Sequence, residues 1–133
     1  MNYFIYPNKG VNDLKFGMTR SEVRDTLPND FFIKPSEPEN DFYEHAGLIT
    51  GYDDNHLLEF IEIISPSSAE YNGIDFFKLK IRSVLSSLNK DGYYTEYNTV
   101  YSGYNFETLG IVLYCPSDKI ESVSVYKKGY YDF

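Results

Sequence analysis

The chain is predicted to adopt an α+β fold of two similar units, each a helix followed by an antiparallel β-meander, that share one core. The order of apolar segments in the first half returns in the second. Val23 corresponds to Val84 and Gly47 to Gly110, so the offset is 61 to 63 residues. A fixed offset indicates an internal repeat. The 133 residues, 42% of them hydrophobic, suit a single domain, with units at about residues 1–66 and 67–133.

The first helix is predicted over residues 19–27. Thr19 can cap the first turn, and Glu22 three residues later completes a capping box. Val23 and Leu27 share one apolar face, and Pro28 stops the helix.

The rest of the first half is predicted to form strands. Residues 2–6 are apolar and aromatic, and 14 tyrosines with 10 phenylalanines favour sheet throughout the chain. Ile61 and Ile63, which alternate with Phe60 and Glu62 and lie on the same side of their strand as Leu57, are expected to face the core. The remaining elements are a polar loop over residues 34–41, a hairpin of residues 41–45 and 48–52, and a strand over residues 57–64.

The second half repeats this order. Apolar residues at helical spacing predict a second helix over residues 76–88, with Asp75 as its N-cap. Strands are expected over residues 93–97, 99–106 with a turn near Gly103, 109–114 and 120–126.

Negative charge is concentrated in the first half. The formal net charge is −8; residues 1–66 hold twelve acids and five bases (−7), and residues 67–133 hold eight acids and seven bases (−1). No Lys or Arg occurs between Lys34 and Lys78. Such a field repels phosphate backbones and attracts basic proteins, so direct nucleic-acid binding is disfavoured.

The cysteine content and the apolar segments of the sequence indicate in which cellular compartment the protein is expected. Cys115 is the only cysteine and forms no intrachain disulfide. The amino terminus lacks the pattern of a signal peptide, and no apolar run has the length of a membrane helix. We expect a cytoplasmic protein without membrane association.

No motif predicts catalysis or a cofactor. His45 and His56 could join Asp53 and Asp54 around a metal, but residues 53–56 are ordinary turn residues. A phosphate-binding loop and a dinucleotide fingerprint are both absent from the sequence. The dense tyrosines of residues 93–104 are either sheet packing or a binding face.

Residues 10–27, GVNDLKFGMTRSEVRDTL, carry a resemblance to known families. The helix pattern F-G-M-[ST]-x-x-E-V, with Tyr52-Asp53, Ile61-Glu62 and Gly129-Tyr130-Tyr131, resembles a group of small bacterial proteins. Acidic members of this group are similar to immunity proteins of polymorphic-toxin and contact-dependent inhibition systems. The helix is also similar to that of the BamE/SmpA family, whose domain packs helices on an antiparallel sheet, although this chain lacks that family's lipobox cysteine.

The resemblance implies a non-enzymatic immunity protein that binds a basic, nuclease-type toxin domain and occludes its active site. A BamE-like scaffold or chaperone module is the alternative, and an enzyme or metal protein is a third possibility. The oligomeric state stays open. The expected partner-binding residues are Glu37, Glu39, Asp41, Glu44, Asp53, Asp54, Tyr93, Tyr94, Tyr97, Tyr101 and Tyr104.

Overall fold

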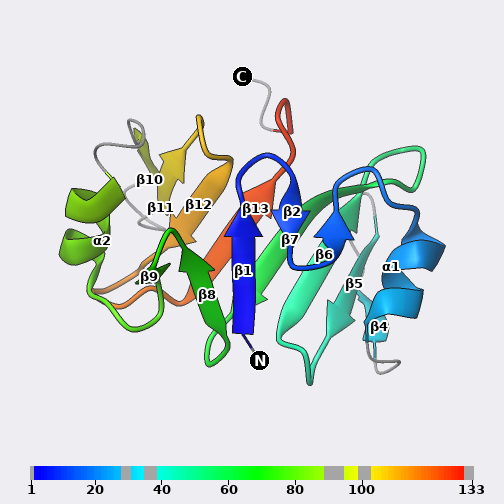
Figure 1. Ribbon diagram of the computed structural model, residues 1–133, viewed down its shortest axis with the longest axis horizontal. Coiled ribbons are helices and arrows are strands. Elements are labelled where there is room, and N and C mark those ends of the chain that lie inside the picture. The colour runs from blue at the N-terminus through cyan, green and yellow to red at the C-terminus, as the bar shows by residue number, and fades with distance from the viewer. Residues whose placement is uncertain (1, 28–30, 35–38, 89–94, 99–102, 131–133) are drawn as a thin grey trace.

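The computed structural model describes residues 2–27, 31–34, 39–88, 95–98 and 103–130. Within these ranges the fold is α+β, as predicted: two helices accompany a five-stranded and an eight-stranded sheet. In Figure 1 the smaller sheet lies in front of the larger one, and the two helices lie at opposite ends of the molecule. None of the helices in these ranges is long and apolar enough to cross a membrane.

The eight-stranded sheet joins two antiparallel meanders, one from each half of the chain. Its order is β10-β11-β12-β13-β7-β6-β5-β4, so the last strands of the two meanders pair antiparallel at the centre. The strands are β4 (Phe31–Lys34), β5 (Asn40–Tyr43), β6 (Leu48–Tyr52), β7 (Leu58–Ile64), β10 (Thr95–Asn98), β11 (Gly103–Phe106), β12 (Ile111–Tyr114) and β13 (Ser122–Tyr126).

The five-stranded sheet has the order β3-β2-β1-β8-β9. Its central strand β1 pairs antiparallel with β2 and parallel with β8. The predicted strand over residues 2–6 is confirmed as β1. The strands are β1 (Asn2–Tyr6), β2 (Gly10–Val11), β3 (Leu14–Lys15), β8 (Ser68–Tyr71) and β9 (Ile74–Asp75).

Helix α1 (Arg20–Thr26) forms where the capping box predicts it. The Thr19 side chain accepts a hydrogen bond from the Glu22 backbone N–H, and the Glu22 carboxylate accepts one from the Thr19 backbone N–H at 2.9 Å. Leu27 is the C-cap. Two of the orphan donors of the first turn are thereby satisfied, which fixes the start of the helix.

Helix α2 (Ile81–Leu88) begins five residues later than predicted, and Asp75 is not its N-cap. Strand pairing continues to Phe76, whose N–H donates to the carbonyl of Ala69 at 2.9 Å. The Asp75 carboxylate instead accepts hydrogen bonds from the Phe77 N–H and the Ser68 hydroxyl. Non-local sheet hydrogen bonds thus override the helical pattern of residues 76–80.

The core lies between the two sheets and contains residues of both halves in one cluster. Tyr3 and Ile5 contribute from β1, and Ile61 and Ile63 are fully buried, as predicted. Leu58, not Leu57, is buried beside them. The cause is a register shift: Gly51 pairs with Phe60 but Tyr52 pairs with Leu58, so residue 59 is an extra residue that reverses the alternation.

Three further boundaries differ from the predictions. Strand β4 was not predicted, and it pairs with β5 at the edge of the large sheet. Asn40 belongs to β5 and not to the loop, and β5 ends at Tyr43, two residues before the end predicted for the strand over residues 41–45. Gly103 begins β11 and lies opposite Tyr114, so it is not a turn residue. Each difference arises from pairing with a neighbouring strand, which local sequence does not encode.

Candidate protein-binding surface

The eight-stranded sheet has an inner face, which packs on the small sheet, and an opposite face that we call the open face. Because Ile61 and Ile63 point inward, their neighbours along β7 point outward. Residues paired directly across strands share a face, which places partners in β5, β6, β12 and β13 on the same side. The open face therefore includes Phe42, Ile49, Phe60, Glu62, Ile64, Val112, Tyr114, Ser122, Ser124 and Tyr126.

This face is more apolar than a solvated sheet face. Antiparallel sheets with one wet face normally alternate apolar and polar residues. Here all residues of β6 are buried, and the outward-facing Ile49 and Val112 are each only 5% exposed. Phe42 and Ile64 are half-buried beside them. Of the residues named for this face, Tyr114 is 36% exposed, and Phe42, Phe60 and Ile64 are partly exposed; these side chains form its accessible apolar part.

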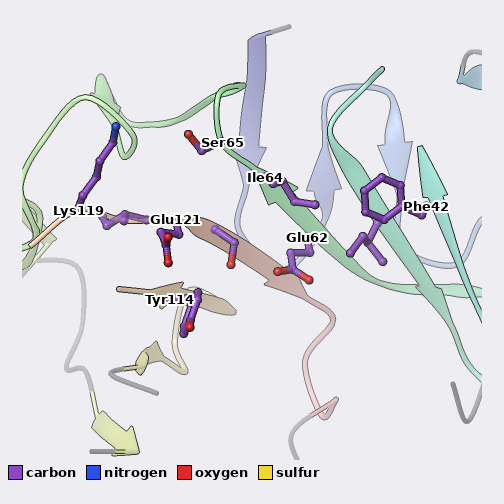
Figure 2. Close-up of a pocket in the computed structure, with 10 residues that line it drawn as sticks. Phe42, Glu62, Ile64, Ser65, Tyr114, Lys119 and Glu121 are labelled. Atoms are coloured by element: carbon purple, nitrogen blue, oxygen red, sulfur yellow. The ribbon is translucent and has the colours of Figure 1, made fainter. Parts of the chain in front are cut away.

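A pocket of about 530 Å³, which we call the junction pocket, opens where β7 meets β13. Two carboxylates, of Glu62 and Glu121, lie at it with the ring of Tyr114 (Figure 2). Lys119 also lines the pocket, but its side chain points away from Glu121 and Tyr114. The remaining lining residues are Phe42, Ile49, Ile64, Ser65, Ile120 and Ser122.

Aromatic rings cover another part of the open face. Tyr130 stacks on Phe60 with ring centroids 5.2 Å apart and lies 6.1 Å from the ring of Tyr126. Burial raises the pKa of Tyr130, and the nearby carboxylates of Glu59 and Glu62 raise it further. Burial also raises the pKa of Glu59. The open face therefore combines aromatic rings with negative charge.

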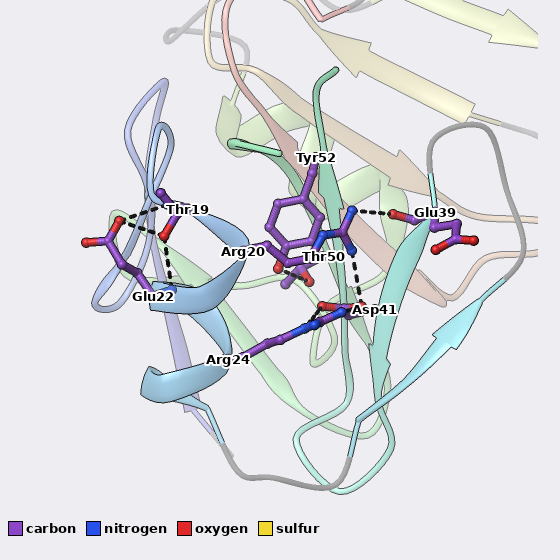
Figure 3. Close-up of polar contacts among 8 residues, drawn as sticks. All are labelled: Thr19, Arg20, Glu22, Arg24, Glu39, Asp41, Thr50 and Tyr52. Carbon is purple, nitrogen blue, oxygen red and sulfur yellow. Dashed lines mark hydrogen bonds and ion pairs between the residues drawn. The ribbon is translucent and has the colours of Figure 1, made fainter. Parts of the chain in front are cut away.

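Asp41 lies on the inner face and is fully buried, which corrects its expected place on an exposed acidic surface. Arg24 donates from Nε and Nη2 to the two carboxylate oxygens at 2.9 Å each, and Arg20 donates from Nη1 at 3.3 Å (Figure 3). The Arg20 guanidinium also lies 4.1 Å from the ring centroid of Tyr52. The pair of arginines neutralises Asp41 and ties α1 to β5.

The other predicted acidic residues are divided between the two ends of the meander. Glu44 is exposed in the turn between β5 and β6. Glu39, Asp53 and Asp54 lie at the opposite end, where β5 begins and β6 ends. Asp53 accepts hydrogen bonds from the N–H groups of residues 55 and 57, so it shapes its turn, whereas Glu39 and Asp54 are exposed.

Most of the predicted tyrosine face lies outside the described residues, as does Glu37: Tyr93, Tyr94 and Tyr101 are not described. Tyr97 belongs to β10, and its side chain is not described. Tyr104 is half-buried and packs against the core from the inner face of β11, so it does not belong to the open face.

The described residues contain no group of three or more His, Cys, Asp or Glu side chains arranged to hold a metal ion. His45 and His56 lie in turns at opposite ends of β6. Cys115 is buried, its thiol donates to the carbonyl of Ser117, and burial raises its pKa, which disfavours the reactive thiolate.

The sequence predictions missed the residues of the junction pocket. A signal for them exists in β7, where Phe60 and Ile64 are apolar on the face opposite to Ile61 and Ile63. A strand that is apolar on both faces, on a sheet covered on one side, indicates a binding surface.

Comparisons of the chain with protein-family models, with curated proteins and with solved structures find no match in any of the three.

Proposed function

We propose that this chain is an immunity protein, which binds a basic, nuclease-type bacterial toxin domain through the open face and blocks its active site. The observation that carries the proposal is the open face, on which the partly exposed side chains of Phe42, Phe60, Ile64 and Tyr114 accompany the carboxylate of Glu62. A protein partner would cover these partly exposed apolar side chains, and the carboxylates of Glu62 and Glu121 would favour a basic partner.

The accessible part of the open face is smaller than the sheet itself. Ile49, Val112, Ser122, Ser124 and Tyr126 are each at most 9% exposed, so a partner would contact mainly the partly exposed residues at and beside the junction pocket. The net charge of −8 would speed the encounter with a basic toxin and would repel its nucleic-acid substrate.

The test is to capture the partner from the organism that encodes the chain. The tagged protein is purified at low salt, and the proteins that accompany it are identified by mass spectrometry. We expect a basic toxin domain that the chain inhibits and that leaves the complex as salt is raised. Tyr114 is 36% exposed on the open face, and Tyr114→Ala is expected to weaken capture.

Tyr6→Ala is the matched control, because Tyr6 is 47% exposed on the five-stranded sheet, away from the open face. Equal capture by the wild type and Tyr114→Ala would contradict the proposed surface. Recovery of envelope proteins that stay bound at high salt would contradict the immunity function and favour the BamE-like scaffold.

We also infer that the two halves of the chain are copies of one unit. In each half an antiparallel strand pair (β1–β2 or β8–β9) leads to a helix and then to a four-stranded meander. Gly47 and Gly110 occupy equivalent turns, both with φ 67°. The Gly47 N–H donates to the backbone carbonyl of Tyr43, and the Gly110 N–H donates to that of Phe106. If the turns are equivalent, replacing residues 44–47 by residues 107–110 preserves the fold; loss of cooperative unfolding would contradict the inference.

A further inference from the structure

We infer that the junction pocket accepts an arginine side chain of the partner. This inference deepens the proposed function and rests on it, since it names the group that the open face recognises. The pocket volume of about 530 Å³ lies within the roughly 300–1,000 Å³ typical of ligand sites, which is ample for one long side chain.

The carboxylates of the pocket have no cationic partner among the described residues. Among the described residues neither Glu62 nor Glu121 forms an ion pair, and the side chain of the pocket lysine, Lys119, points away from Glu121. Glu62 comes from β7 and Glu121 from the residue preceding β13, so the two carboxylates approach the pocket from neighbouring strands. A cation between them would be attracted by both.

The walls of the pocket suit the rest of an arginine. Phe42 and Ile64 are half-buried and apolar, and they can pack along the three methylene groups of the side chain. The ring of Tyr114 is partly exposed at the same pocket and can stack on a planar cation.

Arginine fits this arrangement better than lysine. Its planar guanidinium has five N–H donors and a flat face, so it can bond a carboxylate of the pocket and stack on Tyr114 at once. The lysine ammonium is a compact point charge that is more strongly hydrated. The pocket geometry therefore favours arginine.

The experiment uses the full chain and a small probe. Amide ¹H–¹⁵N spectra are recorded while N-acetyl-arginine amide is added, and the neutral isostere N-acetyl-citrulline amide serves as the control ligand. We expect shifts for the arginine probe at Ile64, Ser65 and Ser122, and much smaller shifts for citrulline. The double variant Glu62→Gln/Glu121→Gln should bind the arginine probe at least about tenfold more weakly.

Glu107→Gln is the matched control variant, because Glu107 is exposed in the turn before β12 and does not line the pocket. It should bind the probe as the wild type does. Equal shifts with citrulline, shifts spread over the acidic turns at residues 53–56, or unchanged binding by the double variant would overturn the inference.

The same variants separate this inference from the proposed function. If the arginine probe binds as expected but the cells yield no basic partner, the proposed function fails and the pocket assignment stands. If a toxin is captured and the double variant binds it as tightly as the wild type, the pocket assignment fails and the proposed function stands.

Discussion

At the scale of single residues, Asp41 is the polar group on which the position of α1 depends. Asp41→Asn keeps the shape of the side chain but leaves Arg20 and Arg24 without their carboxylate. We expect the free energy of unfolding to fall by about 2 to 4 kcal/mol, somewhat less than the roughly 3–5 kcal/mol for a fully buried pair, because the arginine side chains are 15% and 29% exposed.

Chemical denaturation of the wild type and Asp41→Asn measures this difference. Asp25→Asn is the control, because it removes the same charge from an exposed position of α1 and should change stability little. A loss in Asp41→Asn no larger than in Asp25→Asn would show that the ion pairs do not hold α1.

Two buried tyrosine hydroxyls should respond in opposite ways to replacement by phenylalanine. The buried Tyr43 hydroxyl has no hydrogen-bond partner among the described residues, so Tyr43→Phe should leave stability unchanged or raise it by up to about 1 kcal/mol. The Tyr126 hydroxyl donates to Asn105 Oδ1 at 2.6 Å, and Tyr126→Phe should cost about 1 to 2 kcal/mol because buried Asn105 loses a partner. Thermal unfolding of both variants measures the contrast, and equal effects would contradict it.

The burial of Asp41 shows what sequence reasoning lacks at this scale. An acid in a polar, proline-containing stretch is normally solvated, and the acidic interval from Lys34 to Lys78 strengthened that expectation. What the local sequence does not show is that Arg20 and Arg24 form ion pairs with Asp41. The two arginines are four residues apart and share one face of α1. Their approach to β5 depends on tertiary packing.

At the scale of elements, the capping box makes α1 sensitive to acid. Hydrogen bonds from the Thr19 backbone N–H and side chain lower the pKa of Glu22 below its ordinary value of 4.5. A carboxylate whose pKa is lower in the folded state stabilises that state above the unfolded pKa, and this contribution is lost as pH falls through the folded pKa.

The stability difference between the wild type and Glu22→Ala should therefore be fully present at pH 7 and shrink below about pH 4.5. Denaturant unfolding of both proteins across this range measures it. The change in helix propensity adds an offset that does not depend on pH, so a difference that stays constant would contradict the charged role of Glu22.

Elements with local signals were predicted, and those set by long-range pairing were not. The capping box located α1, and the turn between the strands predicted over residues 41–45 and 48–52 located the β5–β6 hairpin. The extra residue 59, which turns Leu58 inward, and the β9 pairing, which delays α2, both depend on a partner strand. The residues next to each of these positions do not show which strand will pair with it.

At the scale of the whole molecule, the two halves should unfold together. The core cluster contains residues of both halves, and β7 pairs with β13 across the boundary between them. We expect one transition, with far-ultraviolet and near-ultraviolet circular dichroism changing at the same denaturant concentration. Two separated transitions would show that the halves are independently stable.

The α+β class followed from periodicity, but the open face could not be predicted from it. Periodicity shows that β6 and β7 are apolar on both sides; it does not show which side the small sheet covers. The junction pocket brings Glu62 and Glu121 together from strands of different halves, so it exists only once β7 and β13 pair.

The measurement that tests the proposed function most directly is a titration of the captured toxin's activity with the wild type and with Glu62→Gln/Glu121→Gln. We predict that the wild type abolishes the activity at a stoichiometric ratio, and that the open-face variant requires at least about tenfold more protein. Equal inhibition by the two proteins would contradict the junction pocket as part of the inhibitory surface. A toxin that stays fully active with bound wild-type protein would contradict the immunity function itself.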